Sequence, residues 1–177
     1  MRETIDYINQ AFELKSQKCY KQAIEMLYKA LEIENDNVEI LFQLGELYFL
    51  LNNFQRAAHY FEKVLAISEK HIETLSYIEK ISVYSNDFVK AFSIAEKIFN
   101  LQNNKKSLSD LIKIASKKGD IEKIKELENS ELKDDEILYD ISKAYYDNKL
   151  YNEAFEKLQN TLKINSNNEE ALILLGK

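Results

Sequence analysis

One alanine recurs along the chain at intervals of 34 residues, and this period constrains the fold more than any other feature of the sequence. It stands at Ala23, Ala57 and Ala91, and a large aromatic residue precedes each of them by three positions. The same pair returns as Tyr151 and Ala154. A fixed period of this length is typical of repeat proteins, in which each repeat is one small structural unit that packs on its neighbours.

A second apolar column follows the same register upstream of the alanines. Its members are Tyr7, Leu41, Leu75, Leu108, Leu138 and Leu172. Each repeat holds two stretches with apolar residues at i, i+3, i+4 and i+7, the spacing that places them on one face of a helix. Polar residues such as Asn52 and Asn53 separate the two stretches. The sequence therefore predicts pairs of antiparallel helices.

Polar residues at these breaks also predict where helices begin. Asn53, Asp87 and Asp120 fall in one column, and their side chains can accept hydrogen bonds from the free N–H groups at the start of a second helix. Gly45 lies inside an expected first helix, where glycine costs about 1 kcal/mol relative to alanine. Close packing of the paired helices at Gly45 is the expected compensation.

These columns resemble those of the tetratricopeptide repeat (TPR) family, whose 34-residue units are helix–turn–helix pairs. The resemblance covers residues 4–168 and is strongest in residues 38–71. The matching residues there are Leu41, Leu44, Gly45, Tyr48, Phe54, Ala57, Phe61 and Ile67. The proline that usually closes a unit is missing, but it only stiffens that turn. The resemblance implies an all-α fold: a right-handed superhelical solenoid of antiparallel helix pairs, with about five repeats plus the first helix of a sixth.

We expect residues 1–177 to form a single TPR solenoid domain. The predicted repeats cover residues 4–37, 38–71, 72–105, 106–134 and 135–168, followed by a partial repeat at 169–177. The fourth repeat is short, because Ala91 and Ala154 are 63 residues apart, five fewer than two full repeats. A stubby second helix is therefore expected near residues 121–128. The partial sixth repeat suggests either a longer native chain or an end that pairs with another chain.

Charge and composition exclude several classes of partner. The chain has 24 Lys and Arg against 30 Asp and Glu, a net charge of −6, and only two of the basic residues are arginine. This balance disfavours DNA or RNA as ligand. No secretory signal and no apolar run of about 18 residues is present, so membrane insertion is not expected. Cys19 is the only cysteine, which fits a reducing compartment, and we expect a cytoplasmic location.

The sequence offers no constellation for catalysis or metal binding. His59, His71 and Cys19 cannot assemble a structural zinc site. Glycine-rich phosphate loops and nucleophile elbows are missing. The acidic run at Asp134 and Asp135 stands at an expected helix start, where the helix dipole favours negative charge. We therefore predict a protein that is not an enzyme and that holds no cofactor or metal.

The expected first helices carry a second stripe of apolar residues. Aromatic residues recur in it seven residues apart, about two helical turns: Phe42 and Phe49, Tyr77 and Tyr84, Tyr139 and Tyr146. Polar anchors lie between them: Gln43, Glu46, Glu73, Lys80, Lys113, Asp140 and Lys143. The resemblance implies that first helices line a concave wall, where rings suit an extended or helical peptide. The candidate groove residues are Ile8, Phe12, Phe42, Gln43, Glu46, Phe49, Tyr77, Lys80, Tyr84, Tyr139, Lys143 and Tyr146. Alternatively, the rings cover neighbouring helices or reflect a tyrosine-rich composition.

The leading hypothesis is a non-enzymatic protein–protein interaction module that binds a peptide or protein segment in its concave groove. One alternative is the regulatory or substrate-docking arm of a larger enzyme that continues beyond Lys177. Another is a self-assembling scaffold, a homo-oligomer joined through the C-terminal partial repeat. One TPR subclass clamps the carboxyl terminus of chaperones with lysines, asparagines and an arginine. That clamp is missing here, because Ile8, Phe12, Gln43, Glu73 and Tyr77 stand at the matching positions.

Overall fold

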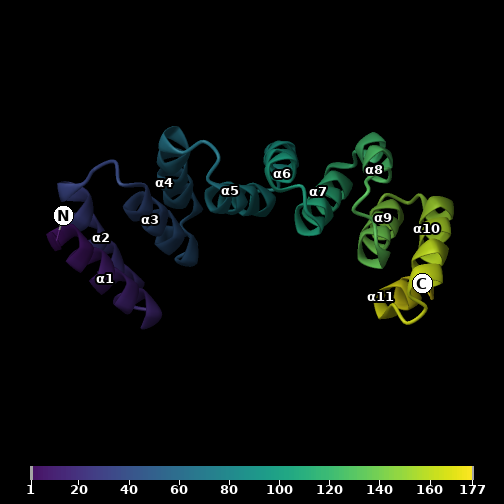
Figure 1. Ribbon diagram of the computed structural model, residues 1–177, viewed down its shortest axis with the longest axis horizontal. Coiled ribbons are helices and arrows are strands. Elements are labelled where there is room, and N and C mark those ends of the chain that lie inside the picture. Colours follow the sequence, from purple (N-terminus) through teal and green to yellow (C-terminus); the bar gives the residue numbers. More distant parts are fainter. Residues whose placement is uncertain (1, 177) are drawn as a thin grey trace. The chain divides into compact units, whose positions relative to one another are not determined.

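The computed structural model describes residues 2–176, and that part of the chain folds into eleven α-helices without a strand (Figure 1). In chain order these are α1 (Arg2–Ser16), α2 (Tyr20–Ile33), α3 (Val38–Leu50), α4 (Phe54–Ile67), α5 (Ile72–Tyr84), α6 (Phe88–Gln102), α7 (Lys105–Lys118), α8 (Ile121–Leu127), α9 (Asp135–Asp147), α10 (Tyr151–Ile164) and α11 (Glu169–Leu175). The predicted all-α helical repeat is confirmed. No helix within residues 2–176 has the length and apolar character needed to cross a membrane.

The chain divides into two compact units, the N-terminal unit Met1–Ile81 and the C-terminal unit Ser82–Lys177. The boundary between them falls inside α5. Each unit holds complete helix pairs and buries its own apolar residues. The prediction that residues 1–177 form a single domain stays a prediction.

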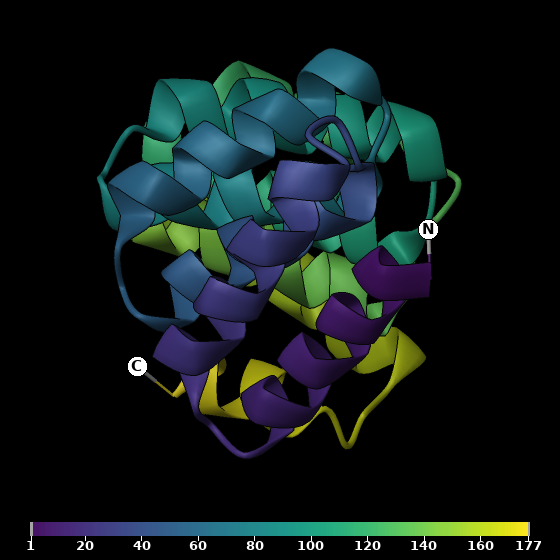
Figure 2. The same cartoon turned by 90° about the vertical axis from the view of Figure 1, so that its left-hand side faces the viewer.

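In the N-terminal unit, α1 packs on α2, α3 packs on α4, and α2 joins the two pairs (Figure 2). The repeated alanines Ala23 and Ala57 are fully buried on the second helices. A Cβ added to Gly45 would lie 2.5 Å from Cε1 of Phe61 on α4. Glycine is therefore required for the close approach of α3 and α4, as the sequence predicts.

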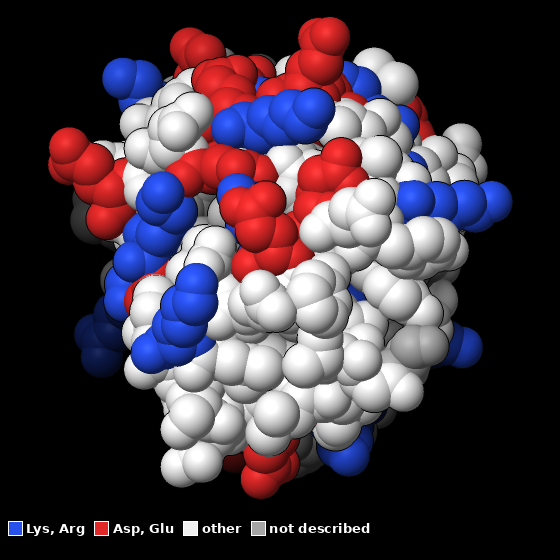
Figure 3. All heavy atoms as spheres, turned by 90° about the vertical axis from the view of Figure 1, so that its right-hand side faces the viewer, with Lys and Arg blue, Asp and Glu red and all other residues white. Residues whose placement is uncertain are grey.

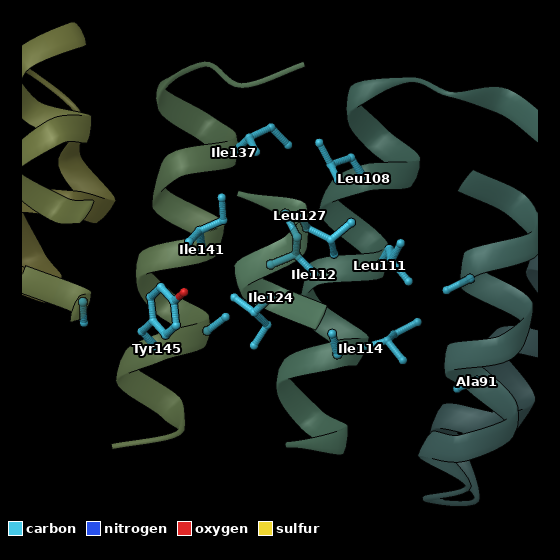
Figure 4. Close-up of a cluster of buried hydrophobic side chains, with 14 residues drawn as sticks. Ala91, Leu108, Leu111, Ile112, Ile114, Ile124, Leu127, Ile137, Ile141 and Tyr145 are labelled. Carbon is cyan, nitrogen blue, oxygen red and sulfur yellow. The ribbon is translucent and has the colours of Figure 1, made fainter. Parts of the chain in front are cut away.

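In the C-terminal unit, α7, α8 and α9 bury one continuous apolar cluster (Figure 4). Leu111 and Ile112 of α7 and Ile141 of α9 are fully buried in it. The predicted short second helix is confirmed, since α8 has only seven residues. Ile124 of α8 stands in the alanine column, is fully buried and fills the space near α9. A larger side chain in this column thus fits beside a shorter helix.

Side-chain caps begin the second helices where the sequence predicts them. The Oδ1 atoms of Asn53, Asp87 and Asp120 accept hydrogen bonds from backbone N–H groups three residues later, at 3.2, 3.0 and 3.1 Å. These caps satisfy donors that the helix itself leaves unpaired.

The turn inside each helix pair shares one backbone conformation. The residue before the second helix's cap has a positive φ in all five pairs: Lys18, Asn52, Asn86, Gly119 and Lys149. Glycine and asparagine adopt this left-handed conformation readily, whereas lysine does so at a cost. Because the conformation recurs even at the lysines, the packing of the helix pair imposes it.

Candidate functional site

The N-terminal unit brings most of the predicted groove residues onto its first helices. Those are Ile8 and Phe12 on α1, Phe42, Gln43, Glu46 and Phe49 on α3, and Tyr77 and Lys80 on α5. We call this surface the N-terminal first-helix face.

Three predicted rings of this face pack on one another. The Tyr77 ring centre lies 5.9 Å from that of Phe42 and 5.0 Å from that of Phe49. Tyr77 also stacks on buried Phe61 of α4 at 5.0 Å. The half-buried rings therefore join α3, α4 and α5, which is packing between repeats. Any contact that they make with a partner stays a prediction.

A chain of polar contacts also crosses the N-terminal first-helix face. The Glu46 carboxylate accepts one hydrogen bond from Nζ of Lys15 on α1 and another, of 2.9 Å, from the Tyr77 hydroxyl on α5. Lys15 donates to Gln43 Oε1 at 3.1 Å, and Gln43 donates to Glu39 at 2.9 Å. Burial, and then the bond to Glu46, raises the pKa of Tyr77 to about 12. These polar groups thus satisfy one another.

The seam between α1 and α3 is closed. Ile8, Phe12, Lys15 and Gln43 are among the residues that border it, and they leave no room for a water molecule. Two of the predicted residues on this face are accessible to a partner. Phe12 is 42% exposed, and Lys80 is exposed as well.

Sequence reasoning passed over Lys15 on this face. Lys15 stands 34 residues before Phe49, in the same repeat column, so the register alone contained the signal. The prediction selected rings from that column and left out the one charged residue in it.

The C-terminal unit has two joined hollows on its first helices, which we call the α7–α9 groove. One hollow, of about 810 Å³, lies at the start of α7, α9 and α11. The other, of about 330 Å³, continues between α7 and α9. Lys113, Tyr139 and Asp140 line both hollows. The other lining residues are Lys105, Lys106, Ser109, Asp135, Glu136, Ile137, Asn165, Asn167, Asn168, Glu169 and Glu170 in the larger hollow, and Ser116, Lys117, Lys143, Ala144 and Asp147 in the smaller.

A compact polar cluster forms the floor where the hollows join. Asp140 accepts a hydrogen bond of 2.5 Å from Ser109 Oγ and lies 3.3 Å from Nζ of Lys113. Lys113 in turn donates to Ser109 Oγ at 2.7 Å. At the rim, hydrogen bonds from Asn165 and Asn168 hold the pKa of Asp135 below its ordinary value. Ser109, Lys113 and Asp140 are therefore already hydrogen-bonded or ion-paired with one another.

The α7–α9 groove contains only part of the predicted set from this unit. Tyr139 and Lys143 line it. Tyr146 lies beside Tyr151, with ring centres 5.5 Å apart, and lines a different hollow bordered by α10 and α11. Tyr84 is largely exposed at the end of α5. Seven-residue spacing on one helix thus does not bring Tyr139 and Tyr146 to the same hollow.

Polar residues at helix starts are the part of the groove that sequence reasoning missed. Asp135 was expected only to stand at a helix start, and the structure places both Asp135 and Asn168 around the larger hollow. The missed signal is that the first helices of successive repeats run in the same direction. Their first residues, which are polar, therefore lie close together in space.

The repeat register and the paired helices are like those of tetratricopeptide repeat proteins, and comparison with known proteins agrees in part. The tetratricopeptide repeat family model matches residues 14–76. No curated protein matches the sequence significantly. Residues 14–76 of this chain therefore match tetratricopeptide repeats.

Solved structures share this fold along nearly the whole chain. YrrB, described as a TPR protein with an unusual peptide-binding site, is 18% identical with a TM-score of 0.74, over 98% of this chain and 92% of YrrB. A MamA structure is 18% identical with a TM-score of 0.75, over 94% of each chain. MamA from Desulfovibrio magneticus RS-1 is 14% identical with a TM-score of 0.75, over 96% of this chain and 98% of that one. At these identities the likeness shows the fold alone.

Proposed function

We propose that this chain is a non-enzymatic protein-interaction module that binds a segment of another protein in the α7–α9 groove. The observation that carries this proposal is the pair of joined hollows of about 810 and 330 Å³ on the first helices of the C-terminal unit. Hollows of about 300–1,000 Å³ are typical of ligand sites in proteins. Because the two hollows share Lys113, Tyr139 and Asp140, they form one elongated site, which suits a peptide.

Charge in the groove favours a peptide that carries lysine or arginine. The larger hollow is lined by five carboxylates and three lysines. Two of those lysines already form ion pairs: Lys105 pairs with Asp134, and Lys113 pairs with Asp140. The exposed carboxylates at the rim, Glu136 among them, would attract a positively charged segment.

Two further features support a peptide as the ligand. The half-buried Tyr139 ring can cover an apolar side chain at little cost in rotamer freedom. The cluster of Ser109, Lys113 and Asp140 supplies polar groups that a peptide backbone could contact. YrrB, with which the chain shares its fold, is described as having a peptide-binding site.

The N-terminal first-helix face is proposed as a second contact area. Its exposed Phe12 and Lys80 would offer one apolar and one charged contact to a partner. Because the seam beside α1 is closed, a partner would contact this face only at its surface. The α7–α9 groove, by contrast, can admit side chains of a partner.

Charge reversal at the groove rim tests this proposal. A random-peptide display library selected on the immobilised chain supplies the ligand, and fluorescence anisotropy measures its affinity. The exposed double variant Glu136→Lys/Glu170→Lys should weaken binding about tenfold or more, equal to about 1.4 kcal/mol. The matched control Glu25→Lys/Glu62→Lys makes the same charge change at exposed positions on α2 and α4 and should leave affinity unchanged.

The control separates a local site from a general charge effect. Equal loss in both double variants would refute the groove, because it would show attraction to the net charge of −6 alone. Full binding by the rim variant would also refute it. Binding to wild type should weaken as salt is added, since exposed charges are screened.

A further inference from the structure

A serine stands on α7 in the repeat column where α3 carries an aromatic ring. Ser116 follows Leu108 by eight residues, as Phe49 follows Leu41. The centre of the Phe49 ring lies 5.0 Å from that of Tyr77 on the next first helix, α5, so this ring occupies the space between the two helices. Ser116 instead lines the smaller hollow of the α7–α9 groove. The smaller hollow therefore corresponds to the space that a ring occupies in the second repeat.

The walls of the smaller hollow suit an aromatic side chain. They include three lysines, a tyrosine and an alanine: Lys113, Lys117, Lys143, Tyr139 and Ala144. The stems of lysines are apolar, and their ammonium groups are attracted to the face of a ring. The Nζ atom of Lys143 already lies 5.9 Å from the centre of the Tyr146 ring. An aromatic side chain in the hollow would find both apolar stems and positive charge beside it.

The two hollows differ in charge, so they favour different side chains. Five carboxylates and three lysines line the larger hollow, whereas three lysines and two carboxylates line the smaller one. A lysine or arginine of a ligand is therefore attracted to the larger hollow and repelled by the smaller. A carboxylate gains little in the smaller hollow, because Lys113 pairs with Asp140 and Lys143 pairs with Asp147. An uncharged ring remains the side chain that fits the smaller hollow best.

We propose that the smaller hollow is a specificity pocket for one aromatic side chain of the bound segment, whose lysine or arginine lies at the larger hollow. This proposal rests on the function proposed above for the α7–α9 groove. Ser109 lines the larger hollow and Ser116 the smaller, and seven residues of α7, about 10.5 Å, separate them. The basic and aromatic residues of the ligand are therefore about three positions apart in an extended segment, or about seven in a helix.

Ser116→Phe tests the pocket, because it places a ring of the chain itself there. The probe is a peptide selected from the random library on the wild-type chain, and fluorescence anisotropy measures its affinity. Replacing its aromatic residue with alanine should weaken binding to the wild-type chain about tenfold. Ser116→Phe should weaken binding of the unchanged peptide to the same extent. The alanine peptide should bind Ser116→Phe and the wild-type chain equally, which separates a filled pocket from a blocked groove.

The matched control Ser116→Ala keeps the pocket open and should bind both peptides as the wild-type chain does. Its fold should persist, because the side-chain amide of Asn148 loses the Ser116 hydroxyl but still donates to the carbonyl oxygens of Ser116 and Ala144, at 3.2 and 2.8 Å. Loss of binding in Ser116→Ala would show that the hydroxyl, rather than the open space, carries the contact, and would overturn the proposal.

A second control addresses adhesion of the peptide's ring to an uncharged surface. Figure 3 shows a broad area without charged side chains on the end of the molecule where α10 and α11 lie. Phe155 of α10 is 50% exposed and lines a hollow separate from the α7–α9 groove. Phe155→Lys should leave the affinity for both peptides unchanged. Weaker binding to this variant would place the ring on α10 and overturn the pocket.

Amide chemical shifts of the wild-type chain test the pocket without any protein variant. The alanine peptide should lose the changes at Ser116 and Ala144 and keep those at Ser109. The proposal is overturned if the selected peptides carry no aromatic residue, if the alanine peptide binds the wild-type chain as tightly as the unchanged one, or if Ser116→Phe with native helical content binds normally. In those cases weaker binding to Glu136→Lys/Glu170→Lys would still support the groove, whereas full binding to that variant would refute the groove itself.

Discussion

Gly45→Ala probes the closest approach of two helices in the N-terminal unit. An added Cβ would lie 2.5 Å from Cε1 and 2.7 Å from Cδ1 of Phe61, whereas carbon atoms in contact normally lie about 3.5–4.0 Å apart. Phe61 is fully buried, stacked on Tyr77 at 5.0 Å and 6.0 Å from Phe42. The ring therefore cannot move aside without disturbing its neighbours.

Two opposing effects decide the sign of this substitution. Alanine gains about 1 kcal/mol over glycine within a helix. Overpacking a closed core costs about 1–3 kcal/mol, and the ring must here move by about 1 Å to restore normal contact. We place the cost in the upper part of that range, so Gly45→Ala should lower the free energy of unfolding by about 1–2 kcal/mol.

Urea unfolding followed by circular dichroism measures this change, and amide hydrogen exchange in α3 and α4 localises it. In a Phe61→Leu background the same substitution should be neutral or stabilising, a coupling of at least about 1 kcal/mol between the two positions. As a control, Gly176→Ala meets its nearest atoms at 3.7 and 3.8 Å and should change stability by less than about 0.5 kcal/mol. A stabilising effect of Gly45→Ala in the wild-type chain would refute the packing described here.

Two other contacts and one backbone conformation give predictions in which the direction of the stability change is known. Glu128→Ala removes the carboxylate that accepts a hydrogen bond from the hydroxyl of buried Tyr145. It should lower the free energy of unfolding in urea by about 1–3 kcal/mol, more than Glu128→Gln does. Equal stability of Glu128→Ala and wild type would contradict this. Lys149 has a left-handed φ of 65°, a conformation that costs a residue with a side chain about 1–2 kcal/mol. Lys149→Gly should therefore raise the melting temperature. A lower melting temperature would contradict this reasoning. Because burial and Glu46 raise the pKa of Tyr77 from 10 to about 12 in the folded chain, its contribution to stability is complete below pH 10 and lost as pH rises toward 12. Glu46→Gln should lower the folded-state pKa, so the loss of stability at high pH becomes smaller and ends at a lower pH in unfolding curves paired with tyrosinate absorbance. An unchanged loss would exclude the contact.

Much of the fold could be predicted because its signals are local or repeat in register. The caps Asn53, Asp87 and Asp120 act within one helical turn of themselves, so residue type and column were sufficient. The close approach at Gly45 followed from the cost of a glycine inside a helix. The left-handed turn residues were harder to predict, because lysine carries no local preference for that conformation.

The candidate site could be predicted only in part, because a hollow depends on how neighbouring helices lie. Tyr139 and Lys143 reach the α7–α9 groove, while Tyr146 faces another hollow. Tyr77 stands in the repeat column of Gln43 rather than Phe42, so equal spacing did not mean an equal position on the helix. The polar rim of the groove comes from three helix starts that are distant in sequence.

The position of a bound peptide on the protein decides whether the α7–α9 groove is the site. Amide chemical shifts of the isotope-labelled chain, recorded as the selected peptide is added, report that position residue by residue. The largest changes should fall at Ser109, Lys113, Tyr139 and Lys143, with α8 and α10 unaffected. Changes confined to α8 and α10, with α7 and α9 unchanged, would contradict the proposed site.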